Sequence, residues 1–226
     1  GAAAVLVDRK ARVRLLPSGA AAWGSPLGAI YASVALLLVG TTTDIYLPYF
    51  LQTLHGYTPL AAGYLTAAMA AGWSCGSLLS SGRTGAAAAR LLRAGPVLGT
   101  ASLLALALLV PSTLPVPGLH MLLCGLALAG VGAGVGIGWP HLLVRVLTLA
   151  PAGEGGMASA AITTVQLYGM AIGAAVAGLV ANAAGLIAPG GVDGAQSAAA
   201  WLLASFALAP LGAALLVRAI TSPTRM

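Results

Sequence analysis

The sequence predicts an all-α membrane protein with six transmembrane helices, arranged as an inverted repeat of three plus three. Only 6% of the 226 residues are charged, the mean hydropathy is +0.98, and the apolar residues gather in six long runs. Soluble domains are about 25% charged, so a water-soluble core is excluded. Each run reaches the ~20 residues that a helix needs to cross a bilayer. The runs cover residues 27–51, 60–80, 94–114, 119–144, 157–188 and 197–217.

The ten Lys and Arg residues set the predicted orientation, because they all lie on alternate sides of the runs. They are found at residues 9–14, 83–93, 145 and 218–225, and the other three links have none. Cationic loops resist translocation, so these links and both ends of the chain are expected in the cytoplasm, with the spans in the inner (plasma) membrane. The cations are scattered rather than gathered in one stripe, so we expect contacts with membrane lipid and no nucleic-acid partner.

These boundaries divide the chain into three parts. Residues 1–26 are expected to form a cytoplasmic lead-in, residues 27–217 one transmembrane domain, and residues 218–226 a cytoplasmic tail. Pro26 is suited to the first turn of the first helix. The long cationic link at 81–93 is expected to hold a short helix on the cytoplasmic surface.

Small residues repeated every four positions predict where helices pack closely in lipid. The second run has one such stripe, the fourth run has two, and the fifth has one. The stripes are Gly63, Ala67, Ala71 and Cys75; Gly130, Gly134 and Gly138; Gly132, Gly136 and Pro140; and Gly169, Gly173 and Ala177. The glycines of the fourth run also predict a pliable helix. Cys75 and Cys124 are expected to be packing residues, with no disulfide.

Asp44 is the candidate proton-coupling residue, because it is the one acid well inside an apolar run. An unpaired charge in hydrocarbon costs at least ~2.5–3.5 kcal/mol, so Asp44 must face a water-filled cavity or take a proton. The alternative is simple hydration near the outer headgroups. Thr41, Pro48 and Gln52 share its helical face and are candidates for lining a substrate pathway.

Five further residues are pathway candidates. Trp73 in the second run would stack on a lipophilic substrate or fill a packing gap, and Pro140 and His141 would form a gate or relay. The alternative for His141 is a hydrated position at the membrane interface. Thr163 and Gln166 in the fifth run would contact substrate or bond neighbouring helices. No catalytic motif, metal-ligand cluster or cofactor motif is present, so we expect no enzyme, metal or cofactor.

The inverted repeat is predicted by orientation and by proline. The first and fourth runs enter the membrane from opposite sides, and each has a late proline, Pro48 and Pro140. Matched interruptions in corresponding helices indicate a pathway between them. Substrate is therefore expected to pass between the first and fourth spans.

Four segments resemble a known family. They are residues 46–52 (YLPYFLQ), 56–63 (GYTPLAAG), 72–77 (GWSCGS) and 158–169 (ASAAITTVQLYG). They are similar to the C-terminal six-helix half of major facilitator superfamily transporters, nearest the drug:proton antiporter branch. The resemblance implies a cavity lined by the first and fourth spans, flanked by the second and fifth. The family's cytoplasmic Gly-Asp-Arg signature is altered at 76–83, which lacks the Asp.

This resemblance implies proton-coupled export of small lipophilic or cationic compounds. The partners would be the substrate, protons, and a missing N-terminal half or partner subunit. The alternative is a membrane protein that does not transport, either an assembly partner or an inactive transporter remnant.

Overall fold

The computed structural model describes residues 16–22 and 24–221, and every regular element in those residues is a helix. The chain makes six passes, three of which are built from shorter helices in line. In chain order the elements are α2 (Pro26–Thr41), the 3-10 helix η1 (Thr42–Ile45), α3 (Leu47–His55), α4 (Pro59–Ser80), α5 (Gly85–Leu109), α6 (Pro117–Gly136), α7 (Trp139–Leu149), α8 (Gly155–Ala183), α9 (Gly191–Phe206) and α10 (Leu208–Thr221).

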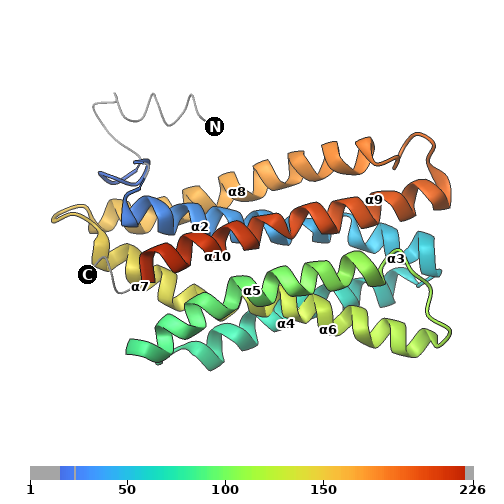
Figure 1. The fold of residues 1–226 in the computed structure, drawn as a ribbon, viewed down its shortest axis with the longest axis horizontal. Helices are drawn as coiled ribbons and strands as arrows, with labels where there is room; N and C mark the ends of the chain where they lie inside the picture. Colours follow the sequence, from blue (N-terminus) through green and yellow to red (C-terminus); the bar gives the residue numbers. More distant parts are fainter. Residues whose placement is uncertain (1–15, 23, 222–226) are drawn as a thin grey trace.

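The helices lie along the long axis of an elongated bundle (Figure 1). We call one end the near end, where α2 begins, α10 ends, α4 turns into α5 and α7 turns into α8. At the opposite, far end lie the end of α3, the α5–α6 link and the α8–α9 link (Figure 1). Since α2 begins and α10 ends at the same end, the number of passes is even, as the alternation of charge predicts.

Five of the six passes are long and apolar enough to cross a membrane. They are Pro26–His55, Gly85–Leu109, Gly118–Leu149, Gly155–Ala183 and Gly191–Thr221. The remaining pass, α4, is long enough at 22 residues but is less apolar, because glycine, serine and threonine interrupt its alanines and leucines.

Side chains and prolines fix the helix starts. The Ser25 hydroxyl accepts a hydrogen bond from the Gly28 N–H, and the Thr58 hydroxyl accepts one from the Ala61 N–H at 3.2 Å. A proline follows each of these N-caps, where its missing N–H costs nothing. Gly56, in the left-handed conformation, ends α3.

Two predicted boundaries are wrong. The link at 81–93 holds no separate surface helix, because α5 begins at Gly85 and runs unbroken to Leu109. Its alanine-rich start has high helix propensity and simply extends the third span. At the far end, α9 begins at Gly191, before the predicted start of the sixth run at residue 197, so Asp193 lies in the first turn of α9.

The two glycine stripes of α6 each pack against a different neighbour. Gly132 and Gly136 face the α4 backbone at Met69 and Trp73. Gly134 faces the α5 backbone instead, and a Cβ added at Gly134 would lie 2.6 Å from the Gly99 nitrogen. Both predicted stripes are confirmed as packing surfaces. One helix needs two stripes because it lies between two others at backbone contact.

The predicted stripe on α4 does not pack against another helix of this chain. Gly63, Ala67, Ala71 and Cys75 are all exposed, and no atom lies within 4 Å of a Cβ added at Gly63. Helix α4 instead turns another face to α6, with Gly72 against Ala129 and Gly76 against Ala133. Four-residue spacing occurs on both faces of α4, so spacing alone could not select the packed one.

The stripe on α8 is confirmed. Gly169 approaches the Ala35 backbone, Gly173 approaches Thr42, and Ala177 is fully buried. Helix α2 therefore packs against α8 on one side and α10 on the other, much as α6 packs against α4 and α5. Contacts of α5 with α9 and α10 join the two groups.

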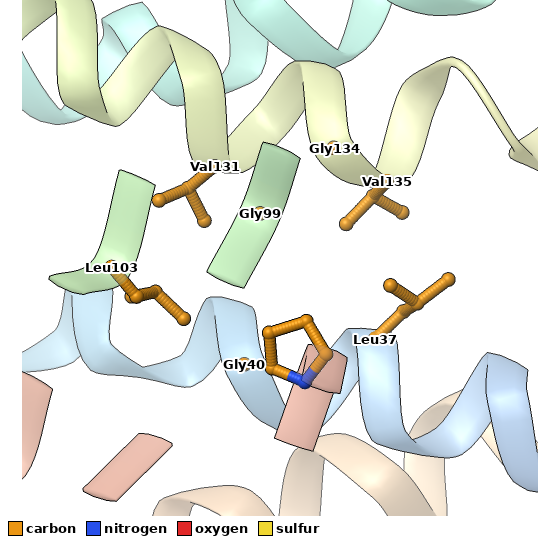
Figure 2. Close-up of a pocket in the computed structure, with 8 residues that line it drawn as sticks. Leu37, Gly40, Gly99, Leu103, Val131, Gly134 and Val135 are labelled. Atoms are coloured by element: carbon orange, nitrogen blue, oxygen red, sulfur yellow. The ribbon is translucent and has the colours of Figure 1, made fainter. Parts of the chain in front are cut away.

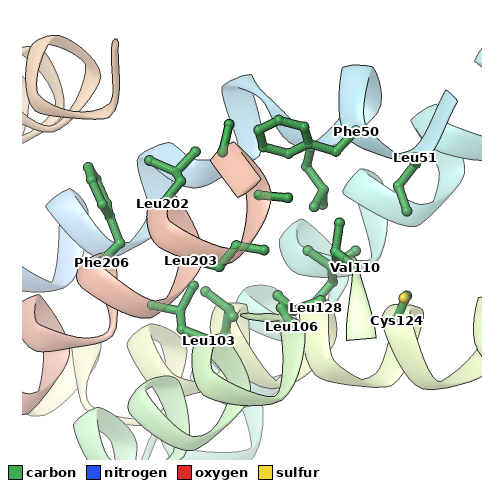
Figure 3. Packing of buried hydrophobic residues seen from close by; sticks show 14 of the residues in the cluster. Phe50, Leu51, Leu103, Leu106, Val110, Cys124, Leu128, Leu202, Leu203 and Phe206 are labelled. Atoms are coloured by element: carbon green, nitrogen blue, oxygen red, sulfur yellow. The ribbon is translucent and has the colours of Figure 1, made fainter. Parts of the chain in front are cut away.

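Large apolar side chains fill the space between the groups in two clusters. The far-end cluster, drawn in Figure 3, brings Phe50 of α3, Leu106 of α5, Leu128 of α6 and Leu202 of α9 together. The second cluster gathers around α2 and α7, where Ile30, Val34 and Leu142 are almost completely buried. These clusters hold the interrupted passes in place beside the continuous ones.

Candidate functional site

The first pass is interrupted at three consecutive threonines. The hydroxyls of Thr41, Thr42 and Thr43 donate to the carbonyls three residues earlier, at 2.8, 2.7 and 3.3 Å. Such side-chain bonds compete with the helix ladder, and Pro48 brings no N–H to continue it. The chain therefore passes through the 3-10 turn η1 before α3 begins.

Asp44 lies in this interruption, half-buried, 18 residues beyond the start of α2. At 1.5 Å per helical residue this is about 27 Å along the bundle. The described part of the chain supplies no cationic partner to its carboxylate. Asp44 is thus an acid in an apolar pass without a compensating charge, as the sequence predicts, while its role in proton transfer stays a prediction.

The other candidates on the first pass differ in their accessibility. Pro48 and Gln52 are half-buried, and the Gln52 amide donates to the Pro48 carbonyl at 3.0 Å. Thr41 is 6% exposed, and its hydroxyl is already bonded to the Leu38 carbonyl. Asp44, Pro48 and Gln52 therefore remain accessible on one pass, whereas Thr41 lies inside the bundle.

The fourth pass is interrupted at the predicted place. Helix α6 ends at Gly136, and α7 begins at Trp139 with Pro140 in its first turn. The ring of Trp139 lies 5.3 Å from that of Trp73 on α4, centroid to centroid, at an angle of 58°. The fold thus brings Trp73 and Pro140 to the same interruption, although they are far apart in sequence.

His141 is buried, with 8% of its surface exposed, so the alternative of a hydrated interfacial histidine is wrong. Its Nε2 has no hydrogen-bond partner among the described residues. An unbonded imidazole nitrogen in a packed interior costs free energy, since it has lost water without a replacement. Arg145 follows one turn later, half-buried.

The eight pathway candidates do not form one site. Thr163 is exposed and Gln166 half-buried on α8, and within residues 16–22 and 24–221 no hydrogen bond or ring contact joins either of them to the other candidates. Three separate groups result: one at the first interruption, one at the fourth-pass interruption, and one on α8.

A small void lies where α2, α5, α6 and α10 meet (Figure 2). Its volume is about 10 Å³, and its lining is apolar: Leu37, Gly40, Gly99, Leu103, Val131, Gly134, Val135 and Pro210. A drug-sized ligand needs ~300–1,000 Å³, so this void is a packing gap and not a substrate site.

Sequence reasoning missed a polar cluster at the far end. We call His55, Tyr57, His120 and Cys124 the histidine cluster. The two imidazole centroids are 4.1 Å apart, and the Tyr57 hydroxyl lies 2.9 Å from His120 Nδ1. Burial, and then the nearby Cys124, raise the pKa of the Tyr57 phenol, which keeps its proton available for this bond. The available signal was that both histidines stand at the same predicted end of two spans.

A second missed contact joins the lead-in to the α7–α8 link. The Ser18 N–H donates to Glu154 Oε2 at 2.6 Å, and the Ser18 hydroxyl donates to Oε1 at 2.8 Å. Glu154 stands at the N-cap of α8 but uses its side chain for Ser18 rather than for the helix. No local sequence signal links residues 136 positions apart.

Comparison with known proteins identifies relatives. Over 181 residues, 80% of this chain, it is 39% identical to probable multidrug-efflux transporters of Mycobacterium tuberculosis, from strains CDC 1551 / Oshkosh and H37Rv. The chain resembles efflux transporters. It spans only 38% of the length of each of these relatives. No protein-family model matches the chain.

Proposed function

We propose that this chain is the C-terminal six-helix half of a major facilitator superfamily transporter, which exports small lipophilic or cationic compounds with a partner half. The observation that supports this most strongly is its 39% identity to probable multidrug-efflux transporters. These relatives are transporters and not enzymes, and the six-pass bundle suits a multi-pass protein of the inner membrane with both ends in the cytoplasm.

The neighbour pattern of the helices supports an inverted three-plus-three repeat. In such a repeat the first, second and third passes correspond to the fourth, fifth and sixth. The contact between α4 and α6 then corresponds to the contact between α8 and α2, and the contact between α5 and α6 corresponds to that between α10 and α2. It also relates the two interrupted passes, which carry Pro48 and Pro140. The α8–α9 contact is the exception, because α4 and α5 do not form a comparable one. Helices related in this way commonly enclose a substrate path.

The exposed face of α4 is a suitable surface for the missing half. Gly63, Ala67, Ala71 and Cys75 lie on it, and α4 is the least lipid-like of the six passes. Small residues favour helix contact over lipid contact, because they let backbones approach. The chain also spans about two fifths of its relatives, which leaves room for six further helices.

Proton coupling is proposed at Asp44. The test is export of a fluorescent cation by the chain together with its partner half, in vesicles with and without a pH gradient. We expect Asp44→Asn to abolish gradient-driven export, and the control Asp193→Asn, at an exposed acid, to leave it intact. Unchanged gradient-driven export by Asp44→Asn would remove this residue from the mechanism.

The same experiment addresses the alternative, an assembly partner or inactive remnant. Such a chain would still bind its partner half in the membrane, but neither the native protein nor any variant would lower the internal concentration of the dye. Its partial coverage of its relatives is the observation that favours this alternative.

A further inference from the structure

We propose that the histidine cluster is a proton-sensitive contact that holds the far ends of α3, α5 and α6 together while its imidazoles are neutral. The inference concerns the stability of this end of the bundle and does not depend on the proposed transport function. It is argued from the hydrogen bonds of the two rings, from their separation, and from the groups around them.

The hydrogen bonds identify which nitrogens carry protons. His55 Nε2 lies 2.8 Å from the Val110 carbonyl, and His120 Nε2 lies 3.0 Å from the Leu109 carbonyl. Carbonyl oxygens only accept, so each Nε2 donates. His120 Nδ1 is then the acceptor for the Tyr57 hydroxyl, 2.9 Å away. A neutral ring satisfies all of these bonds.

These bonds add to the local capping of α5, in which the Val110 N–H bonds the Leu106 carbonyl and Ser112 donates to the Leu108 and Leu109 carbonyls. The last carbonyls of a helix have no N–H from the next turn, and Pro111 has none to offer. His55 bonds the Val110 carbonyl, His120 shares the Leu109 carbonyl with Ser112, and the Gln196 amide of α9 donates to the Pro111 carbonyl at 2.7 Å. The far end of α5 is therefore capped by side chains of three other helices.

A single proton is tolerated and a second is not. The carbonyl end of a helix attracts a nearby cation, so the carbonyls of α5 offset part of the charge of one imidazolium. Two imidazoliums with centroids 4.1 Å apart would repel strongly. Protonation of His120 Nδ1 also removes the acceptor of the Tyr57 hydroxyl.

Among the residues that the structure describes, no charged side chain bonded to either ring offsets the second proton. The α3–α4 link presents Tyr57, α6 presents Cys124, and α9 presents the neutral Gln196. The nearest acid of α9, Asp193, is exposed in its first turn, and within residues 16–22 and 24–221 no carboxylate bonds to either ring. Acidification should therefore separate the ends of α3 and α6 from α5.

Cys124 gives a direct readout of this separation. Its thiol is fully buried, with the sulfur 3.8 Å from His120 Nε2, whereas Cys75 is exposed on α4. The chain with Cys75→Ser, in lipid nanodiscs, is treated with an uncharged pyridyl disulfide between pH 7.5 and 5.0. A Cys124→Ser chain, which reports Cys75, supplies the pH dependence of the reagent itself.

We expect the Cys124 rate, divided by the Cys75 rate, to rise about tenfold as the pair takes up protons over this range. His55→Gln keeps a donor for the Val110 carbonyl but cannot take a proton, so its ratio should stay flat and low. A flat ratio in the native cluster would overturn the proposal. An equal rise of this ratio in the His55→Gln chain would also overturn it. A high ratio at every pH in the His55→Gln chain would show that this variant is misfolded, and the ratio measured in the native cluster would then decide.

Discussion

The contact between α4 and α6 provides the sharpest test of the packing. Gly72 and Gly76 of α4 interlock with Gly132 and Gly136 of α6, each glycine facing the backbone of the other helix. A methyl group at Gly132 would overlap the carbonyl oxygen of Met69. Backbone atoms cannot rotate away, so Gly132→Ala must force the two helices apart along the whole contact.

The magnitude follows from two opposing effects. Alanine gains up to ~1 kcal/mol of helix propensity over glycine. Overpacking in a tight core costs ~1–3 kcal/mol, and more where a side chain cannot yield. We therefore expect Gly132→Ala to destabilise the fold by about 2 kcal/mol net, which corresponds to a fall in Tm of roughly 4–8 °C for a chain of this size.

The assay uses Cys124 as an internal probe in a Cys75→Ser chain. The buried thiol reacts with a fluorogenic maleimide when the bundle unfolds on heating in detergent. The matched control is Gly63→Ala, on the same pair of helices, where no atom lies within 4 Å of the added carbon. Gly63→Ala should leave Tm unchanged or raise it slightly. If Gly132→Ala and Gly63→Ala have the same Tm, the close backbone contact between α4 and α6 is refuted.

Three further substitutions have distinct expected outcomes. Gly134→Ala should lower Tm by several degrees, because its added carbon falls 2.6 Å from the Gly99 nitrogen, whereas Gly99→Ala, whose nearest neighbour is 3.6 Å away beside the void, should melt as the native chain does. Glu154→Ala should cost about 1 kcal/mol, seen as a small fall in Tm, because both bonds from Ser18 are lost, and Ser18→Ala in the same chain should add little, since the bond between the Ser18 hydroxyl and Glu154 is already broken. Tyr57→Phe should destabilise by ~1–3 kcal/mol in the same melting assay, because it leaves the buried His120 Nδ1 with only the weak thiol donor of Cys124 at 3.9 Å, and an unchanged Tm would contradict the Tyr57 bond.

Local signals in the sequence predicted the features that depend on neighbouring residues. Apolar runs located the passes, because the bilayer fixes their minimum length. Pro48 and Pro140 marked both interruptions, since a missing N–H acts on its own helix. The α8 stripe was confirmed because Gly169 and Gly173 lie against α2, although Ala174 and Gly178 have the same spacing on another face of α8.

Features that depend on pairing between distant residues could not be predicted. Periodicity placed the α4 stripe on the exposed face, because only the position of α6 decides which small residues are used. His55 and His120 are 65 residues apart, and their contact requires the ends of α3 and α6 to meet at the end of α5. Nothing in the local sequence of either histidine encodes that meeting.

The glycines of α6 also constrain how the fourth pass can move. Abundant glycine predicts a pliable helix, yet Gly132, Gly134 and Gly136 are each in contact with the backbone of α4 or α5. A bend within α6 would break both contacts at once. The interruption at residues 137–138 lies beyond them, where a Cβ added at Gly138 would be 3.6 Å or more from its neighbours, and where Pro140 has weakened the helix ladder. The backbone contacts of α6 with α4 and α5 therefore leave the interruption as the position in this pass where a change of direction costs least.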